Sequence, residues 1–122
     1  AAVPAAASSD QADVVKAFEG WRAAWSARDL DGYFAAYSDG FTPDAHTTHA
    51  AWKRYKRRVI MAKDFIHVGA KHVVFKSLLA GKRAQLSFDE HFESNDYRED
   101  TRKLLEFAKI HGRWEITREA DL

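Results

Sequence analysis

The chain has no cysteine, only two prolines and a single methionine among its 122 residues. The lack of cysteine excludes disulfide bonds, thiolate metal sites and a cysteine nucleophile. No apolar run approaches the roughly 18 residues that a membrane-spanning helix needs, so we expect no transmembrane segment. The formal net charge is only +1. Because nucleic-acid binding depends on a strongly basic surface, we expect no nucleic-acid partner.

The composition that remains is typical of a globular protein, with 46% hydrophobic and 30% charged residues. A chain of this length buries roughly two thirds of its unfolded surface and needs no covalent staple. The first residues are rich in alanine and serine, which favours a flexible leader or linker over residues 1–9. We predict one domain over residues 10–122.

Three helices are predicted in the first half of the chain. The first can be capped by Ser8, Ser9 or Asp10. Its apolar face follows at helical spacing and consists of Val14, Phe18, Trp21 and Trp25.

The second and third predicted helices are shorter. Asp29 is placed to cap the second, which carries Leu30, Tyr33, Phe34 and Tyr37 at helical spacing. Ser38, Asp39 and Gly40 are expected to end it. Thr47 or Thr48 can cap the third helix, which runs to about Met61 with Trp52, Tyr55 and Val59 on one side.

The second half of the chain alternates between apolar and polar residues, which predicts strands with one buried face. An antiparallel meander is expected from Arg83 to Arg118. Its inward positions are Ala84, Leu86, Phe88, Phe92, Lys103, Leu105, Phe107, Trp114 and Ile116. Residues 65–76 suggest one or two further strands with a bend near Gly69. The fold class is therefore α+β: three N-terminal helices packed on a curved antiparallel sheet of four or five strands.

Several motifs carry a resemblance to a known family. They are W-x3-W-x3-D-x3-Y-x3-Y-x3-F from Trp21 to Phe41, Trp52 in a basic helix, FDEHFESNDY from Phe88, KLLEF from Lys103 and GRWEITRE from Gly112. The chain resembles the cone-shaped fold shared by nuclear transport factor 2 and ketosteroid isomerase. Within it, the chain is similar to the C-terminal domain of bacterial L,D-transpeptidases and of envelope tetratricopeptide-repeat proteins. It departs from that pattern at Glu90, where glutamine is more usual, and at Leu104, where threonine is more usual.

The resemblance implies an accessory binding or interaction domain that is periplasmic or associated with the bacterial cell envelope, although a cytoplasmic location stays open. It implies no cofactor. The chain cannot be the transpeptidase itself, because that chemistry uses a catalytic cysteine and none is present.

Glu90 is the most informative candidate site residue, because alternation places its carboxylate on the apolar face of the sheet. The favoured interpretation is an ion pair with Lys103 or contact with water at the mouth of the cone. The alternative is a general base opposite hydroxyl donors from Tyr33 and Tyr37. The predicted pocket lining comprises Trp21, Trp25, Tyr33, Tyr37, Trp52, Tyr55, Phe88, Glu90, Phe92 and Lys103.

A basic run in the third helix is the candidate partner-binding patch. It contains Lys53, Arg54, Lys56, Arg57 and Arg58, with no acid among them. A solvated helix face is the usual meaning of such a run. It could also steer an anionic partner or orient a homodimer. His46 and His49 are too few to form a zinc site, so we predict no metal.

Three functions stay open at this point. The favoured one is a non-catalytic binding or protein-interaction module, since no complete catalytic set is present. The second is a small-molecule isomerase, dehydratase or cyclase. The third is a homodimerisation domain. The sequence names neither a protein partner nor a small-molecule ligand.

Overall fold

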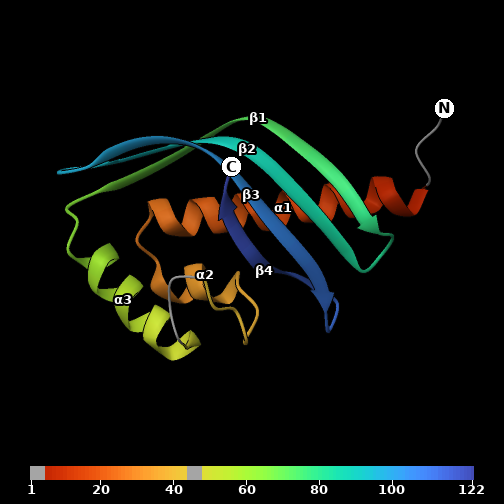
Figure 1. Cartoon of the computed structure of the whole chain (residues 1–122), viewed down its shortest axis with the longest axis horizontal. Helices are drawn as coiled ribbons and strands as arrows, with labels where there is room; N and C mark the ends of the chain where they lie inside the picture. Colours follow the sequence, from red (N-terminus) through yellow and green to blue (C-terminus); the bar gives the residue numbers. More distant parts are fainter. Residues whose placement is uncertain (1–4, 44–47) are drawn as a thin grey trace.

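The computed structural model describes residues 5–43 and 48–122, with side chains from Ser9 onward (Figure 1). The elements, in order, are α1 (Ala5–Ser26), α2 (Leu30–Ala35), α3 (His49–Met61), β1 (Ile66–Leu79), β2 (Arg83–Ser94), β3 (Arg98–Ile110) and β4 (Arg113–Asp121). No helix in the described part of the chain is long and apolar enough to cross a membrane.

The four strands form one antiparallel sheet in the order β1-β2-β3-β4. This confirms the predicted meander and the α+β fold class. The sheet is curved, α1 lies along one of its faces, and α2 and α3 lie on the far side of α1 (Figure 1). The helices therefore cover the apolar face that the alternation of the strands predicted.

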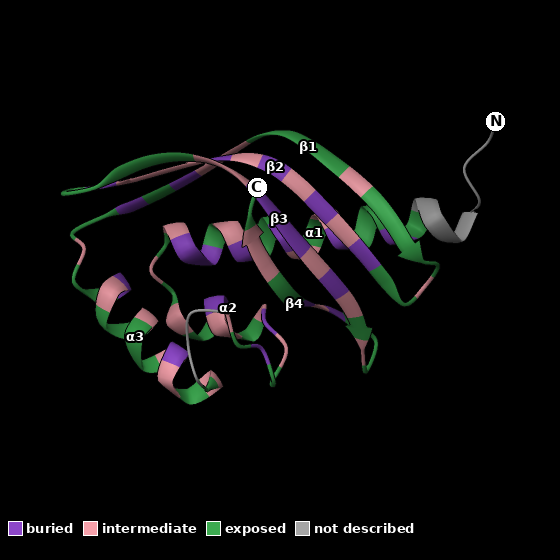
Figure 2. Cartoon of the chain, in the orientation of Figure 1, coloured by how far each residue is buried: buried purple, intermediate pink, exposed green. Residues whose placement is uncertain are grey.

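The core lies between α1 and the sheet. Leu86 and Phe88 of β2 are fully buried, and buried and half-buried residues alternate along that strand (Figure 2). Trp21 is also fully buried, and Phe18 packs on Phe88 with ring centroids 4.7 Å apart. The tryptophans of the first helix therefore cover the sheet as predicted.

β1 bends at a different residue from the one expected. It is a single strand of 14 residues, and its pairing with β2 is interrupted between Lys71 and Val74 rather than at Gly69. His72, inside this interruption, has a φ of 53°. Gly69 stays in register opposite His91. The bulge is set by the pairing of β1 with β2, which the composition of β1 alone does not reveal.

α1 begins earlier than predicted. It starts at Ala5, so Ser9 and Asp10 lie inside the helix rather than at its cap. Asp10 is only 6% exposed, and its Oδ2 accepts a hydrogen bond of 2.6 Å from the N–H of Gly81 in the β1–β2 turn. Its role is thus a long-range anchor of the helix to the sheet. The predicted leader falls partly on residues 1–4, outside the described residues.

The other two helices begin at the predicted caps. Asp29 accepts a hydrogen bond of 3.1 Å from Gly32, and Thr48 accepts one of 3.0 Å from Ala51. The alternative cap, Thr47, lies outside the described residues. α2 ends at Ala35, five residues before Gly40, because the next segment is captured by β4: Ser38 donates to the carbonyl of Ile116 and Ile116 donates to that of Ala36, both at 2.9 Å.

We expect Phe88→Ala to lower the free energy of unfolding by about 3–5 kcal/mol, because it opens a cavity in a core that cannot collapse around it. Urea unfolding monitored by circular dichroism measures this change. Phe65→Ala is the matched control, since Phe65 is 46% exposed and its loss should cost under about 1 kcal/mol. Equal costs for the two variants would contradict the placement of Phe88.

Candidate functional site

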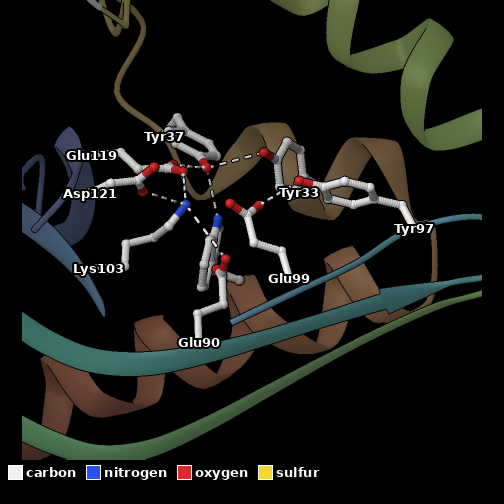
Figure 3. A network of polar contacts seen from close by, with 9 residues as sticks. Tyr33, Tyr37, Glu90, Tyr97, Glu99, Lys103, Glu119 and Asp121 are labelled. Carbon is white, nitrogen blue, oxygen red and sulfur yellow. Dashed lines mark hydrogen bonds and ion pairs between the residues drawn. The ribbon is translucent and has the colours of Figure 1, made fainter. Parts of the chain in front are cut away.

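A bulge on β4 places the residues of the polar centre. Phe107 pairs with Ile116 but Glu106 pairs with Arg118, so Thr117 is an extra residue on β4. The alternation of inward and outward side chains is therefore shifted by one beyond Ile116. This shift places Glu119 and Asp121, rather than Arg118, on the face that Lys103 of β3 also occupies (Figure 3).

Lys103 is the only ammonium in this centre that pairs with described carboxylates. It is 8% exposed, and its Nζ donates to Glu119 Oε2 at 2.8 Å. Glu90 Oε2 and Asp121 Oδ1 each lie 3.7 Å from the same nitrogen. Burial alone would lower the pKa of Lys103, but the charges of Glu119 and Glu90 outweigh it and hold the pKa above its usual value. Lys103 therefore stays charged.

Glu90 makes a longer contact with Lys103 than Glu119 does. It is 6% exposed, and its Oε1 has no hydrogen-bond partner among the described residues. Burial raises the pKa of Glu90 to about 7; Lys103 opposes the rise, and the negative charges of Glu119 and Asp121 add to it. The ion pair with Lys103 predicted from the sequence is present, although it is a long one.

Of the two tyrosines proposed to face Glu90, Tyr37 is hydrogen-bonded to Glu119 and Tyr33 to Tyr37. The Tyr37 hydroxyl donates to Glu119 Oε1 at 2.6 Å and accepts a hydrogen bond of 2.9 Å from the indole N–H of Trp21. The hydroxyls of Tyr33 and Tyr37 are hydrogen-bonded at 3.2 Å. Burial, and then the charge of Glu119, raises the pKa of both tyrosines. They are permanent donors, but the structure does not join them to Glu90 by a hydrogen bond.

Glu119 is the functional candidate that the sequence reasoning missed. Burial would raise its pKa, but the ammonium groups of Lys103 and Lys56, together with the hydrogen bonds from Lys103 and Tyr37, hold the pKa of Glu119 below its usual value. The pKa of Glu90 is thus raised and the pKa of Glu119 is lowered. Only the bulge at Thr117 brings Glu119 inward, and neither residue type nor alternation signals it.

Two cavities open at the mouth of the cone, on either side of Lys56 and Lys103. The first has a volume of about 380 Å³ and the second about 270 Å³. Of the predicted lining residues, the first cavity is lined by Trp25, Tyr55, Glu90, Phe92 and Lys103, and the second by Trp52, Tyr55 and Lys103. Tyr33, Tyr37 and Phe88 are buried deeper and line neither cavity, and Trp21 lines a different groove. The cone is thus filled at its base and open at its mouth.

Aromatic rings hold part of the basic patch of α3. Lys56 lies over Trp25 with its Nζ 5.3 Å from the ring centroid, and Lys53 lies over Phe34 at 5.1 Å. Burial lowers the pKa of Lys56, although the charge of Glu119 opposes the shift. These contacts fix the two lysines without neutralising them.

The arginines of the patch face solvent. Arg54, Arg57 and Arg58 are exposed, and Arg58 lies 5.8 Å from the ring centroid of Tyr55. Among the described residues, none of the five cations of the patch forms an ion pair with a carboxylate. By contrast Lys63, which follows α3, pairs with Asp96 of the β2–β3 turn at 2.7 Å.

The histidines that the structure describes lie outside this polar centre. His72 contacts Asp89 at 2.6 Å and His91 contacts Asp100 at 2.7 Å, all at the surface of the sheet. The hydrogen bond to Asp100 raises the pKa of His91. Over residues 5–43 and 48–122, no group of three or more histidine, aspartate and glutamate side chains could hold a metal ion. His46 lies outside this range.

We expect Glu90→Gln to change the pH dependence of stability. Because the pKa of Glu90 is raised in the folded state from 4.5 to about 7, the folded protein binds the extra proton, and stability falls as the pH rises between these values. The free energy of unfolding of the unmodified protein, relative to Glu90→Gln, should fall by about 2–3 kcal/mol from about pH 4 to about pH 8. Urea unfolding across this range measures it. Glu99→Gln, at an exposed position, is the control and should leave the dependence of the unfolding free energy on pH unchanged. If Glu90→Gln and the unmodified protein showed the same pH dependence, the raised pKa of Glu90 would be contradicted.

Solved structures share this fold. Bd1075 of Bdellovibrio bacteriovorus is 20% identical with a TM-score of 0.80, and the match covers 89% of this chain and 38% of that protein. The helical cell shape determining protein Pgp2 of Campylobacter jejuni, as its K307A mutant, is 16% identical with a TM-score of 0.79, over 88% of this chain and 39% of that one. This chain therefore spans under half the length of both proteins.

A third relative in structure is close to this chain in size. It is an NTF2-like protein of Streptomyces avermitilis, provisionally described as a dehydratase, which is 12% identical with a TM-score of 0.72 over 92% of this chain and 94% of that one. No curated protein matches the chain in sequence. A family model, described as the Cds6 C-terminal NTF2-like domain, matches residues 13–120. The chain therefore belongs to this family of NTF2-like domains, and its three helices on a four-stranded sheet agree with that fold.

Proposed function

We propose that this domain is a non-catalytic binding module, an accessory part of a larger bacterial cell-envelope protein, that engages an anionic partner through the basic patch of α3. The observation that carries the proposal is that none of the five cations of this patch forms an ion pair with a described carboxylate. Like charges on one helix repel one another, and an anionic partner relieves that repulsion.

The polar centre supports a binding role over catalysis. Lys103 is held by three carboxylates, and the Tyr37 hydroxyl is committed to Glu119. An acid–base set for catalysis needs a base and a donor that both face the substrate. Here the hydroxyls of Tyr33 and Tyr37 line neither mouth cavity. The lengths of Bd1075 and Pgp2, in which the matched region is 38–39% of the chain, agree with an accessory domain.

Reversing charge on α3 should abolish partner capture without unfolding the domain. We expect Arg54→Glu combined with Arg57→Glu to reduce binding to a bacterial cell-envelope preparation at least tenfold in a co-sedimentation assay, because both side chains are exposed. Circular dichroism should show a Tm within about 2 °C of the unmodified protein.

The matched control carries the same change of charge elsewhere. Lys71→Glu combined with Lys76→Glu alters two exposed residues of β1 and should leave capture unchanged. If both double variants lost binding equally, the effect would be one of net charge and the proposal would be contradicted. Full binding by the α3 variant would also contradict it.

The alternative function is a small-molecule isomerase, dehydratase or cyclase, and one observation favours it. Glu90 has a pKa of about 7, an Oε1 without a partner and a place on the wall of the first mouth cavity. A carboxylate with a pKa near the working pH suits a general base. In this interpretation Tyr33 and Tyr37 take no part in the reaction, since neither lines the cavity.

Exchange of carbonyl α-protons for deuterium tests this alternative directly. A panel of cyclic ketones incubated with the protein in D₂O should show exchange by NMR that Glu90→Gln slows at least 100-fold, within the range for losing a general base. Glu99→Gln removes a carboxylate from the same cavity and should keep the activity. Exchange no faster than in buffer alone would rule out the alternative for this substrate class.

A further inference from the structure

A groove separate from the mouth of the cone lies between α1, α2 and the β3–β4 turn. Its volume is about 680 Å³, which is within the range of ligand sites. Its lining includes Ala17 and Gly20 of α1, Ala36 after α2, and Gly112 of the turn. Neither the basic patch of α3 nor Glu90 contributes to it.

Glycine residues keep this groove open. Gly20 lies in the middle of α1, where glycine weakens a helix relative to alanine. A Cβ at Gly20 would meet no atom within 4 Å, and the same holds at Gly112, whose φ is 79°. The turn at Gly112 requires glycine because of its positive φ, but nothing in the helix requires it at Gly20. Glycine at position 20 therefore leaves room in the groove, and a side chain there would not clash with a neighbouring atom.

A buried tryptophan forms part of the wall of the groove. Trp114 lines it, is only 8% exposed, and its indole Nε1 has no hydrogen-bond partner among the described residues. The other indole of the groove, that of Trp21, already donates to Tyr37. This N–H is enclosed, but the Trp114 ring lies in the wall, so its indole resonance should report on occupancy of the groove.

The groove is bordered by cations. Lys16, Lys109 and Arg113 line it and are exposed, and Asp13 is the one acidic side chain beside them. Arg113 Nη2 donates to the carbonyl of Ala35 at 3.5 Å, but none of these four side chains forms an ion pair with a described residue. The border therefore favours a ligand with several negative charges.

We propose that this groove binds an acidic peptide segment of a partner protein. The side-chain carboxylates of the peptide face Lys16, Lys109 and Arg113, and its backbone runs along the wall that Trp114 helps to form. Most of the lining residues are exposed, so the groove is shallow. A small molecule needs most of its surface enclosed, whereas an extended peptide gains from contacts spread along an open groove.

The experiment uses an acetylated hexaglutamate peptide and the ¹⁵N-labelled protein. Trp114→Phe identifies the indole N–H resonance of Trp114 in the HSQC spectrum. We expect that resonance to shift saturably with hexaglutamate and to stay unmoved with hexalysine. An unmoved Trp114 resonance at saturating hexaglutamate would overturn the proposal. An equal shift with glutarate at the same carboxylate concentration would also overturn it, because the site would then take any small anion.

Two groove variants and one control separate this site from general charge attraction. Lys109→Glu combined with Arg113→Glu should weaken hexaglutamate binding at least tenfold, while Lys71→Glu combined with Lys76→Glu, on β1, should change it less than threefold. Gly20→Leu should block the groove, also by at least tenfold, without changing the charge or lowering the Tm, because the space at Gly20 is open. Full affinity in Gly20→Leu, or equal loss in the two charge variants, would contradict a peptide seated in the groove.

Discussion

A buried chain of hydrogen bonds from Trp21 through Tyr37 and Glu119 to Lys103 holds the domain together. It crosses from α1 to the segment after α2, then to β4 and finally to β3, with donor–acceptor distances of 2.9, 2.6 and 2.8 Å. Hydrogen bonds to charged groups are stronger than neutral ones, and bonds in a shared network reinforce one another. The helices and the sheet are thus joined by polar contacts as well as by the apolar core.

The same hydrogen bonds also set the charge states of Glu119 and Glu90 at the mouth of the cone. Lys103 Nζ is closest to Glu119, at 2.8 Å, and 3.7 Å from Glu90. Glu119 has the tyrosine and the lysine as donors and remains ionised, whereas Glu90 keeps one oxygen without a partner. Burial therefore raises the pKa of Glu90, the charge of Lys103 only partly opposes the rise, and the charge of Glu119 adds to it.

Alternation along the strands was enough to predict the sheet, the inward position of Glu90 and its pairing with Lys103. It could not predict Glu119, because Thr117 shifts the parity of β4 and that shift arises from pairing with β3. The interruption of β1 lies at His72 rather than at Gly69 for the same reason, since the position of a bulge depends on the pairing of two strands. The predicted cap of α1 was wrong because Asp10, a good capping residue, is used by the distant Gly81 instead. Local signals thus located the elements, while contacts between elements set their details.

The consecutive strand order has a consequence for how the chain folds. Each strand pairs with its neighbour across a short turn, so the sheet closes small loops and costs little chain entropy. The contact between Asp10 and Gly81 instead spans 71 residues, and that between Tyr37 and Glu119 spans 82. Because non-local contacts slow folding, we expect the N-terminal helices to dock after the strands of the meander have paired.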